Sequence, residues 1–282
     1  MDFRRIQYIL IVAFLILDLF LLNIFVGKNS VYFLNDYNRS TAPSVQKEMN
    51  LEELTETSVS DETGELPFVA GQLDLEAWQE EAEKLTDQEV TVDSKGRLFS
   101  KLDRPIPVAS LQKGTAEDSW SVSDFKEIND FKDSSHLLNG KDYQFAYYNP
   151  RKSTITYYQE AYDGHGIIDG TGDLIFHLND KQEVDAYEQS YAGETQVQGE
   201  DRPLISEKQA IENLYLNDEI PNKATVVKVK IGYRTSLALD QLHMYKPIWT
   251  IYIRHNDDEI ETEYVDGING TIIQPQTTNT GT

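Results

Sequence analysis

Histidine is the residue type in this sequence most suited to metal binding or general acid–base chemistry. The histidines stand singly along the chain: His136, His165, His177, His243 and His255. No two of them have the short spacing of a zinc ligand pair, so we expect each to be a surface or core side chain. The chain also has no cysteine, which excludes disulfides, thiol nucleophiles and thiolate metal sites. The sequence therefore predicts no metal and no cofactor.

Carboxylates crowd near the C-terminus, where they could bind Ca²⁺ or act as a glycosidase pair. The cluster consists of Asp257, Asp258, Glu259, Glu261 and Glu263. The three glutamates alternate in sequence, which is typical of one solvated face of a strand. Residues 256–258 are expected to form the turn before it. A bound metal is the less favoured interpretation, and a catalytic acid pair is less favoured still.

A glycine-rich segment, residues 163–173, could cradle a phosphate. Such loops follow a parallel strand and open a helix, whereas this segment has strand patterns on both sides. We therefore expect a flexible hairpin connection, exposed enough to meet a partner.

Known catalytic motifs are missing, including H-E-x-x-H, G-x-S-x-G, the Walker A loop and the kinase motifs. The sequence thus favours a protein that is not an enzyme and has no catalytic residues. The 48 acidic residues against 25 basic ones give a net charge of −23, which repels nucleic acid. A membrane-anchored cell-wall hydrolase or modifying enzyme remains the alternative from another class.

Residues 6–26 are almost wholly apolar and, as a helix, would span roughly 30 Å, one hydrocarbon core. We expect an uncleaved transmembrane helix. A cleaved signal peptide is the alternative, but no Ala-x-Ala-like site follows the apolar run. Arg4 and Arg5 precede the segment, which places the N-terminus in the cytoplasm and the rest of the chain outside. The predicted location is the cell membrane, in a single pass, with an extracellular C-terminal domain.

Within this helix, four residues fall within about 40° of one another at helical spacing. They are Gln7, Phe14, Asp18 and Phe25. A carboxylate near the middle of a membrane helix costs about 2.5–3.5 kcal/mol, so Asp18 calls for a partner. We predict that this stripe contacts another membrane helix. The alternative is that Asp18 is protonated or extends toward the outer headgroups.

The start Met1-Asp2 and the stretch Phe14-Leu15-Ile16-Leu17-Asp18-Leu19-Phe20-Leu21-Leu22 resemble the N-terminal anchor of the YycI (WalI) family. The resemblance implies a single-pass protein that regulates WalK, an essential cell-wall sensor histidine kinase. It also implies a membrane complex with the related protein YycH, formed by transmembrane and extracellular contacts. The close match in sequence covers about 25 residues. For the rest of the chain, the resemblance depends on the order of an anchor, a linker and an acidic ectodomain.

The pattern of composition divides the chain into five parts. We predict a cytoplasmic tip and transmembrane helix at 1–28, a linker at 29–67, a first α+β unit at 68–202, a second at 203–275 and a disordered tail at 276–282. The two units share the order of a helix followed by an antiparallel meander, which suggests a tandem duplication. The second unit resembles a PepSY-like module, which leaves a PepSY-type protease inhibitor as a further alternative. Helices on antiparallel sheets make the predicted fold class α+β.

Helical spacing predicts a helix at 74–86 capped by Asp74, with Glu80 and Lys84 as an ion pair. A helix is also expected near 123–131, and a third from Ser206, where Ser206 and Gln209 form a capping box. A hairpin is predicted around a turn at 93–96, ending before Pro105 and Pro107. The remaining predicted strands lie at 143–147, 154–162, 173–178, 183–191, 225–233, 247–254, 259–265 and 271–273.

The predicted strands are rich in aromatic side chains, including Tyr143, Phe145, Tyr147, Tyr157, Tyr158 and Tyr162. They could line a carbohydrate groove. Alternation instead favours one set in the core and the other on a sheet face that binds protein.

Overall fold

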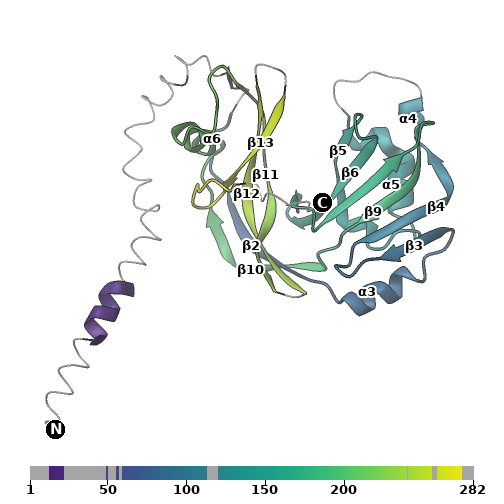
Figure 1. Ribbon diagram of the computed structural model, residues 1–282, viewed down its shortest axis with the longest axis horizontal. Coiled ribbons are helices and arrows are strands. Elements are labelled where there is room, and N and C mark those ends of the chain that lie inside the picture. Colours follow the sequence, from purple (N-terminus) through teal and green to yellow (C-terminus); the bar gives the residue numbers. More distant parts are fainter. Residues whose placement is uncertain are drawn as a thin grey trace, which may run out of the picture. The chain divides into compact units, whose positions relative to one another are not determined.

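The computed structural model describes residues 13–21, 49, 55–56, 59–112, 120–239, 241–255 and 259–274. It is an α+β protein with more strand than helix (Figure 1). The chain divides into two compact units. The central unit comprises Gly64–Leu204 and Lys230–Thr250, and the terminal unit comprises Met1–Thr63, Ile205–Val229 and Ile251–Thr282. Neither unit is a single stretch of chain, whereas the sequence predicts two consecutive units.

The central unit contains a seven-stranded sheet within the described residues. Its strand order is β3-β4-β9-β8-β6-β5, and β7 pairs with β6. The strands are β3 (Gln88–Val92), β4 (Leu98–Pro107), β5 (Tyr143–Asn149), β6 (Thr154–Tyr162), β7 (His165–Gly166), β8 (Asp173–Leu178) and β9 (Glu183–Gln189). All of its pairings are antiparallel. The strands predicted between residues 143 and 191 are thereby confirmed.

Short helices connect and cover these strands. They are α3 (Leu75–Ala82), α4 (Ala109–Gln112), α5 (Lys126–Lys132) and the 3₁₀ helices η2 (Val122–Phe125) and η3 (Gly140–Asp142). Asp74 caps α3 as predicted, accepting from the Ala77 backbone N–H at 3.1 Å. The helix ends at Ala82, earlier than predicted, so Lys84 lies outside it. Lys84 therefore pairs with Glu81 at 2.5 Å, and the predicted pairing with Glu80 is wrong.

A single hydrophobic cluster joins α3, η2 and α5 to the sheet. Trp78, Phe125 and Ile128 from the helical segments pack in the same cluster as Tyr157 and Phe176 from the strands. The helices therefore cover one face of this sheet, and burial of that face stabilises the unit.

The aromatic strands β5 and β6 are two-sided as predicted, but Tyr147 departs from strict alternation, because a β-bulge between Phe145 and Tyr147 shifts the register. Tyr143 and Tyr157 are buried in the cluster, and Phe145 packs against it. Tyr147 is 44% exposed, and its ring meets that of Tyr158 at 6.2 Å on the outer side.

Strand β4 continues through Pro105 and Pro107, where the sequence predicts a break. Strand β3 pairs with β4 only as far as Leu102. Beyond Leu102, one edge of β4 pairs with no other strand among the described residues. Proline is tolerated on such an edge because it lacks the N–H that strand pairing would require. The pairing with β9 resumes at Ile106 after a shift of register.

A second sheet has the strand order β1-β11-β12-β2-β10, with β13 on β12, among the described residues. Its strands are β1 (Thr55–Glu56), β2 (Glu65–Gln72), β10 (Glu194–Pro203), β11 (Thr225–Leu239), β12 (Leu242–Arg254) and β13 (Ile260–Asp266). Strand β2 begins inside the predicted 29–67 linker. Within the central unit, Val69, Ala161, Ile167, Tyr233 and Tyr245 form a second buried cluster with Ala192.

The terminal unit contains α6 (Glu207–Leu216), which starts at the predicted capping box. The Ser206 hydroxyl accepts from the Gln209 backbone N–H at 3.2 Å, and the Gln209 side chain accepts from the Ser206 N–H at 3.0 Å. The helix buries Ala210, Ile211 and Leu214.

Two expectations for the end of the chain need correction. Glu263 does not belong to a solvated strand face, since it is only 6% exposed, and burial raises the pKa of its carboxyl group. The strand predicted at 271–273 is reduced to one bridge between Ile272 and Val265. Residues 256–258, where a turn is predicted, lie outside the described residues.

Candidate functional site

The predicted membrane stripe is only partly within the described residues. Phe14 and Asp18 lie on a helix at 13–21, four residues apart and so on one face of it. Gln7, Phe25, Arg4 and Arg5 lie outside the described residues. No helix in the described part of the chain is both long and apolar enough to cross a membrane.

The helix at 13–21 exposes apolar side chains around its whole circumference. Phe14 is 62% exposed, Ile16 63% and Phe20 60%. Asp18 is the one charged residue among residues 13–21, and the remaining side chains there are apolar. Such a composition is suited to a lipid or protein environment.

The histidines and acids form pairs rather than a metal cluster. His177 lies 3.0 Å from Glu188, and His255 lies 2.8 Å from Glu261. Among the described residues no group of three or more His, Asp or Glu side chains is placed to hold a metal ion.

The glycine-rich segment forms the predicted hairpin connection, because β7 within it turns back on β6. The predicted exposure is wrong for most of it, since only Asp163 and Gly164 are exposed and Ile167 is buried in a bridge to Tyr233. Its polar centre is Asp169. One carboxylate oxygen accepts from the Thr171 hydroxyl at 2.6 Å, and the other accepts from the Thr235 backbone N–H at 2.6 Å. Asp169 thereby ties the hairpin to β11, a role that the sequence analysis did not identify.

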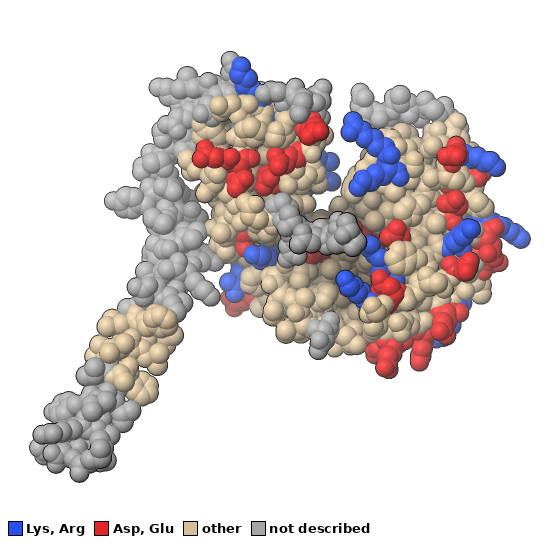
Figure 2. Space-filling view, viewed as in Figure 1, with Lys and Arg blue, Asp and Glu red and all other residues tan. Residues whose placement is uncertain are grey.

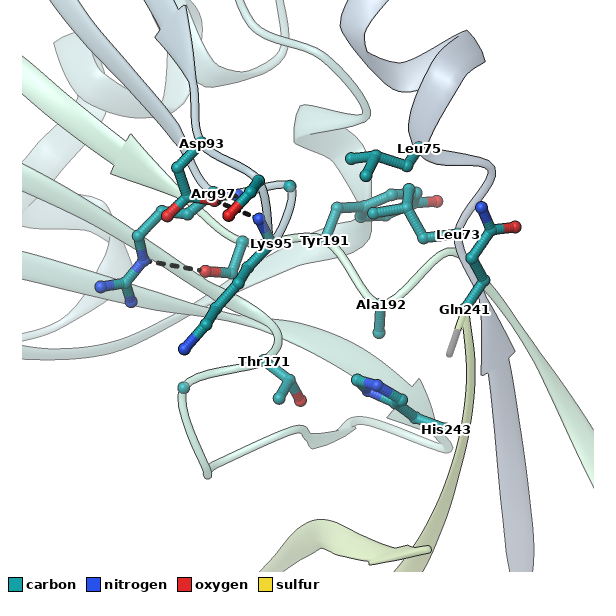
Figure 3. Close-up of a pocket in the computed structure, with 14 residues that line it drawn as sticks. Leu73, Leu75, Asp93, Lys95, Arg97, Thr171, Tyr191, Ala192, Gln241 and His243 are labelled. Carbon is teal, nitrogen blue, oxygen red and sulfur yellow. Dashed lines mark hydrogen bonds between the residues drawn. The ribbon is translucent and has the colours of Figure 1, made fainter. Parts of the chain in front are cut away.

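Beside this hairpin the central unit contains a cavity of about 600 Å³ (Figure 3). One wall is the β3–β4 turn at 93–97, and the opposite side includes Thr171 and His243. Figure 3 shows Leu73, Leu75 and Tyr191 grouped on one side of the cavity, away from Lys95 and Arg97. The cavity thus has an apolar part and a cationic part. A volume of this size is typical of small-molecule sites.

The turn that carries both cations is rigidly built. Asp93 accepts backbone hydrogen bonds from Lys95 at 2.8 Å and Arg97 at 2.9 Å through one carboxylate oxygen. Gly96 between them has φ +84°, and a Cβ there would lie 3.1 Å from the Leu73 side chain and 3.2 Å from that of Leu75. Glycine is therefore needed for both conformation and space.

The apolar wall is equally well fixed. The Tyr191 ring stacks on Trp78 with centroids 5.4 Å apart, and its hydroxyl donates to Asp142 at 2.7 Å. Trp78 in turn donates to the Gly96 carbonyl at 3.0 Å. The two walls of the cavity are thus linked by a hydrogen bond.

Asp173 lies next to the cavity, at the start of β8. Its pKa is raised to about 7, mainly by burial and then by the nearby Asp169 carboxylate, while Arg97 opposes the shift. One of its carboxylate oxygens is buried without a hydrogen-bond partner among the described residues. A backbone hydrogen bond from Gly170, like Arg97, opposes the shift, but burial outweighs both and favours the neutral form of the carboxyl group.

The fold and these features define a mixed α+β protein with a cavity in its central unit. The family model described as "YycI protein" matches residues 34–268. The chain therefore belongs to the YycI family. This is a family of regulatory proteins, not known as enzymes, that act in the YycG/WalK two-component system and associate with that kinase system.

Solved structures of low similarity were also found. An uncharacterized protein from Eubacterium rectale matches with 9% identity and a TM-score of 0.43, covering 79% of this chain and 91% of that chain. The YpeB C-terminal domain of Bacillus megaterium matches with 8% identity and a TM-score of 0.34, covering 72% of this chain and 96% of that chain. No curated protein matches this chain. The PepSY-like character of the second unit stays a prediction.

Proposed function

We propose that this protein is a non-enzymatic regulator anchored in the cell membrane, which modulates the sensor kinase through contacts inside the membrane and outside the cell. Its partners are the WalK/YycG-like kinase and a YycH-like membrane protein. The observation that carries the proposal is membership of the YycI family over residues 34–268.

The apolar helix at 13–21 supports the membrane part of the proposal. Its described side chains are apolar apart from Asp18, a composition suited to contact with lipid and other helices. In this setting Asp18 and Phe14 lie on the face that meets the partner helix, and Arg4 and Arg5 keep the N-terminus in the cytoplasm.

The acidic surface and the two-sided aromatic sheet support the extracellular part. Figure 2 shows separate groups of acidic and basic side chains on the visible face, which suits charge-complementary docking of a protein partner. The exposed Tyr147 and the half-buried Tyr158 beside it add aromatic side chains of the kind enriched in interfaces.

The membrane contact is tested by changing Asp18 to Leu. A polar contact between helices contributes about 0.6–2 kcal/mol, so association with the kinase should weaken about three- to thirty-fold. Phe14→Ala should act in the same direction. Leu19→Ala, about 100° round the helix from Asp18, is the matched control and should have a smaller effect.

The measurements are crosslinking to the kinase in intact membranes and transcription of genes controlled by its response regulator. If Asp18→Leu inserts normally and leaves both unchanged, the helix contact is excluded and regulation must act through the extracellular part.

A further inference from the structure

The cavity of the central unit has a local charge opposite to that of the whole chain. Its lining includes Lys95 and Arg97 against one acid, Asp93. The complete chain carries −23. Cations on one wall of a cavity in so acidic a protein provide a local point of attraction for an anion.

The two cations differ in how far they are already neutralised. The Arg97 guanidinium lies 3.4 Å from Glu188 and donates through Nε to Ser190 at 3.1 Å. Lys95 is exposed, and among the described residues its ammonium group has no hydrogen-bonding or ionic partner. Lys95 is therefore the cation available to a ligand.

The polar groups opposite Lys95 extend the anion site. Figure 3 shows the Lys95 side chain extending toward the loop that carries Thr171, with His243 on the far side of the cavity. The His243 Nδ1 lies 3.3 Å from the Tyr245 hydroxyl, which leaves Nε2 without a partner among the described residues. A ligand can thus find a charge and a ring nitrogen in one cavity.

The remaining wall is suited to a hydrophobic group. Leu73 and Leu75 are half-buried beside the Tyr191 ring, which is held in place by its stacking on Trp78. Preorganised walls of this kind reduce the ordering that binding requires. The volume of about 600 Å³ accommodates a small molecule.

We propose that this cavity binds a small organic monoanion, a carboxylate with a hydrophobic body. The carboxylate lies at the Lys95 ammonium and the body packs on Leu73, Leu75 and Tyr191. Lys95 is the lining cation without a direct ionic partner among the described residues, and one such cation matches a single negative charge better than the two charges of a phosphate dianion. This inference stands independently of the kinase-regulating role proposed above.

The test uses the full chain in lipid nanodiscs and two matched probes, N-acetyl-4-fluorophenylalanine and its neutral amide. Fluorine NMR titration measures both affinities, with empty nanodiscs as the blank. We expect the acid to bind about three- to ten-fold more tightly than the amide at low salt, and the difference to shrink as salt rises.

The variant Lys95→Met keeps most of the side-chain length and removes the charge. It should weaken binding of the acid to the level of the amide and leave the amide unchanged. Lys181→Met removes an exposed lysine on the β8–β9 turn, outside the cavity lining, and should alter neither affinity. Leu75→Ala should weaken both probes alike, because it shortens the apolar wall.

Equal affinities for acid and amide, no saturable binding of the acid, or equal effects of Lys95→Met and Lys181→Met would each overturn the proposal. Competition by inorganic phosphate at lower concentration than the acid would show a phosphate site instead and would overturn the choice of a carboxylate.

Discussion

Replacing Asp173 with Asn tests the electrostatics of the central unit. Burial raises the pKa of the Asp173 carboxyl group in the folded state to about 7 from its ordinary value of 3.8, so between these pH values the folded state holds a proton that the unfolded state has released. The contribution of Asp173 to the free energy of unfolding of the wild type is therefore most favourable below about pH 4. It declines as the pH rises to about 7. A shift of about 3 units corresponds to at most ~4 kcal/mol. Asparagine cannot ionise, so the Asp173→Asn variant avoids this pH-dependent loss of stability.

We expect the free energy of unfolding of Asp173→Asn, relative to wild type, to increase by about 2–3 kcal/mol between pH 5 and pH 8, because part of the full effect already occurs below pH 5. Urea denaturation followed by tryptophan fluorescence measures it on the full chain in one detergent. Asp180→Asn, an exposed acid on the β8–β9 turn, is the control and should show no such increase. If the free energies of unfolding of Asp173→Asn and wild type change in parallel between pH 5 and pH 8, the assignment of a buried, proton-binding carboxyl group is refuted.

Three further predictions concern packing and caps. Gly193→Ala should destabilise the fold by more than about 2 kcal/mol in urea denaturation, because φ is +82° and a Cβ would lie 1.9 Å from the Gln72 carbonyl oxygen. Gly164→Ala, with φ +76° and nothing within 4 Å, should cost only about 1 kcal/mol, and equal losses would contradict the steric explanation. Phe176→Ala should cost about 3–5 kcal/mol by the same assay, since Phe176 is fully buried, and Phe99→Ala, 38% exposed, should cost much less. Ser206→Ala should cost about 1 kcal/mol by loss of the α6 cap, and faster amide hydrogen exchange confined to the first turn of α6 would locate the effect there.

The parts of the fold that could be predicted are those governed by local chemistry. The Ser206 capping box, the Asp74 cap and the aromatic strands β5 and β6 each depend on neighbouring residues. Short-range patterns therefore located them. The β3–β4 turn at 93–97 belongs to the same group, since Asp93 and Gly96 are both turn formers.

Elements defined by distant contacts were missed or misplaced. Strand β10 is polar and largely exposed, and it is a strand because it pairs with β2, more than a hundred residues earlier. The division into units was also hidden, because residues 230–250 join Gly64–Leu204 through pairings such as that of β12 with β2. No pattern among neighbouring residues in the sequence indicates the pairing of β10 with β2 or of β12 with β2.

The cavity could not be predicted for the same reason. Leu73, Lys95, Thr171 and His243 come from four separate segments, and each looks ordinary in sequence. The Asp169 carboxylate offered a signal, since an acid among glycines is suited to hydrogen bonding with nearby backbone N–H groups. Its bond to Thr235, 66 residues away, follows only from the fold.

The central claim, that this protein regulates the sensor kinase by direct association, is tested most directly by crosslinking and mass spectrometry of intact membranes containing the full chain at its natural level. The account predicts crosslinked peptides between this chain and the kinase and between this chain and the YycH-like protein, with the kinase links reduced by Asp18→Leu. Abundant crosslinks of this chain to other proteins, with none to the kinase in membranes where the kinase is itself detected, would contradict it.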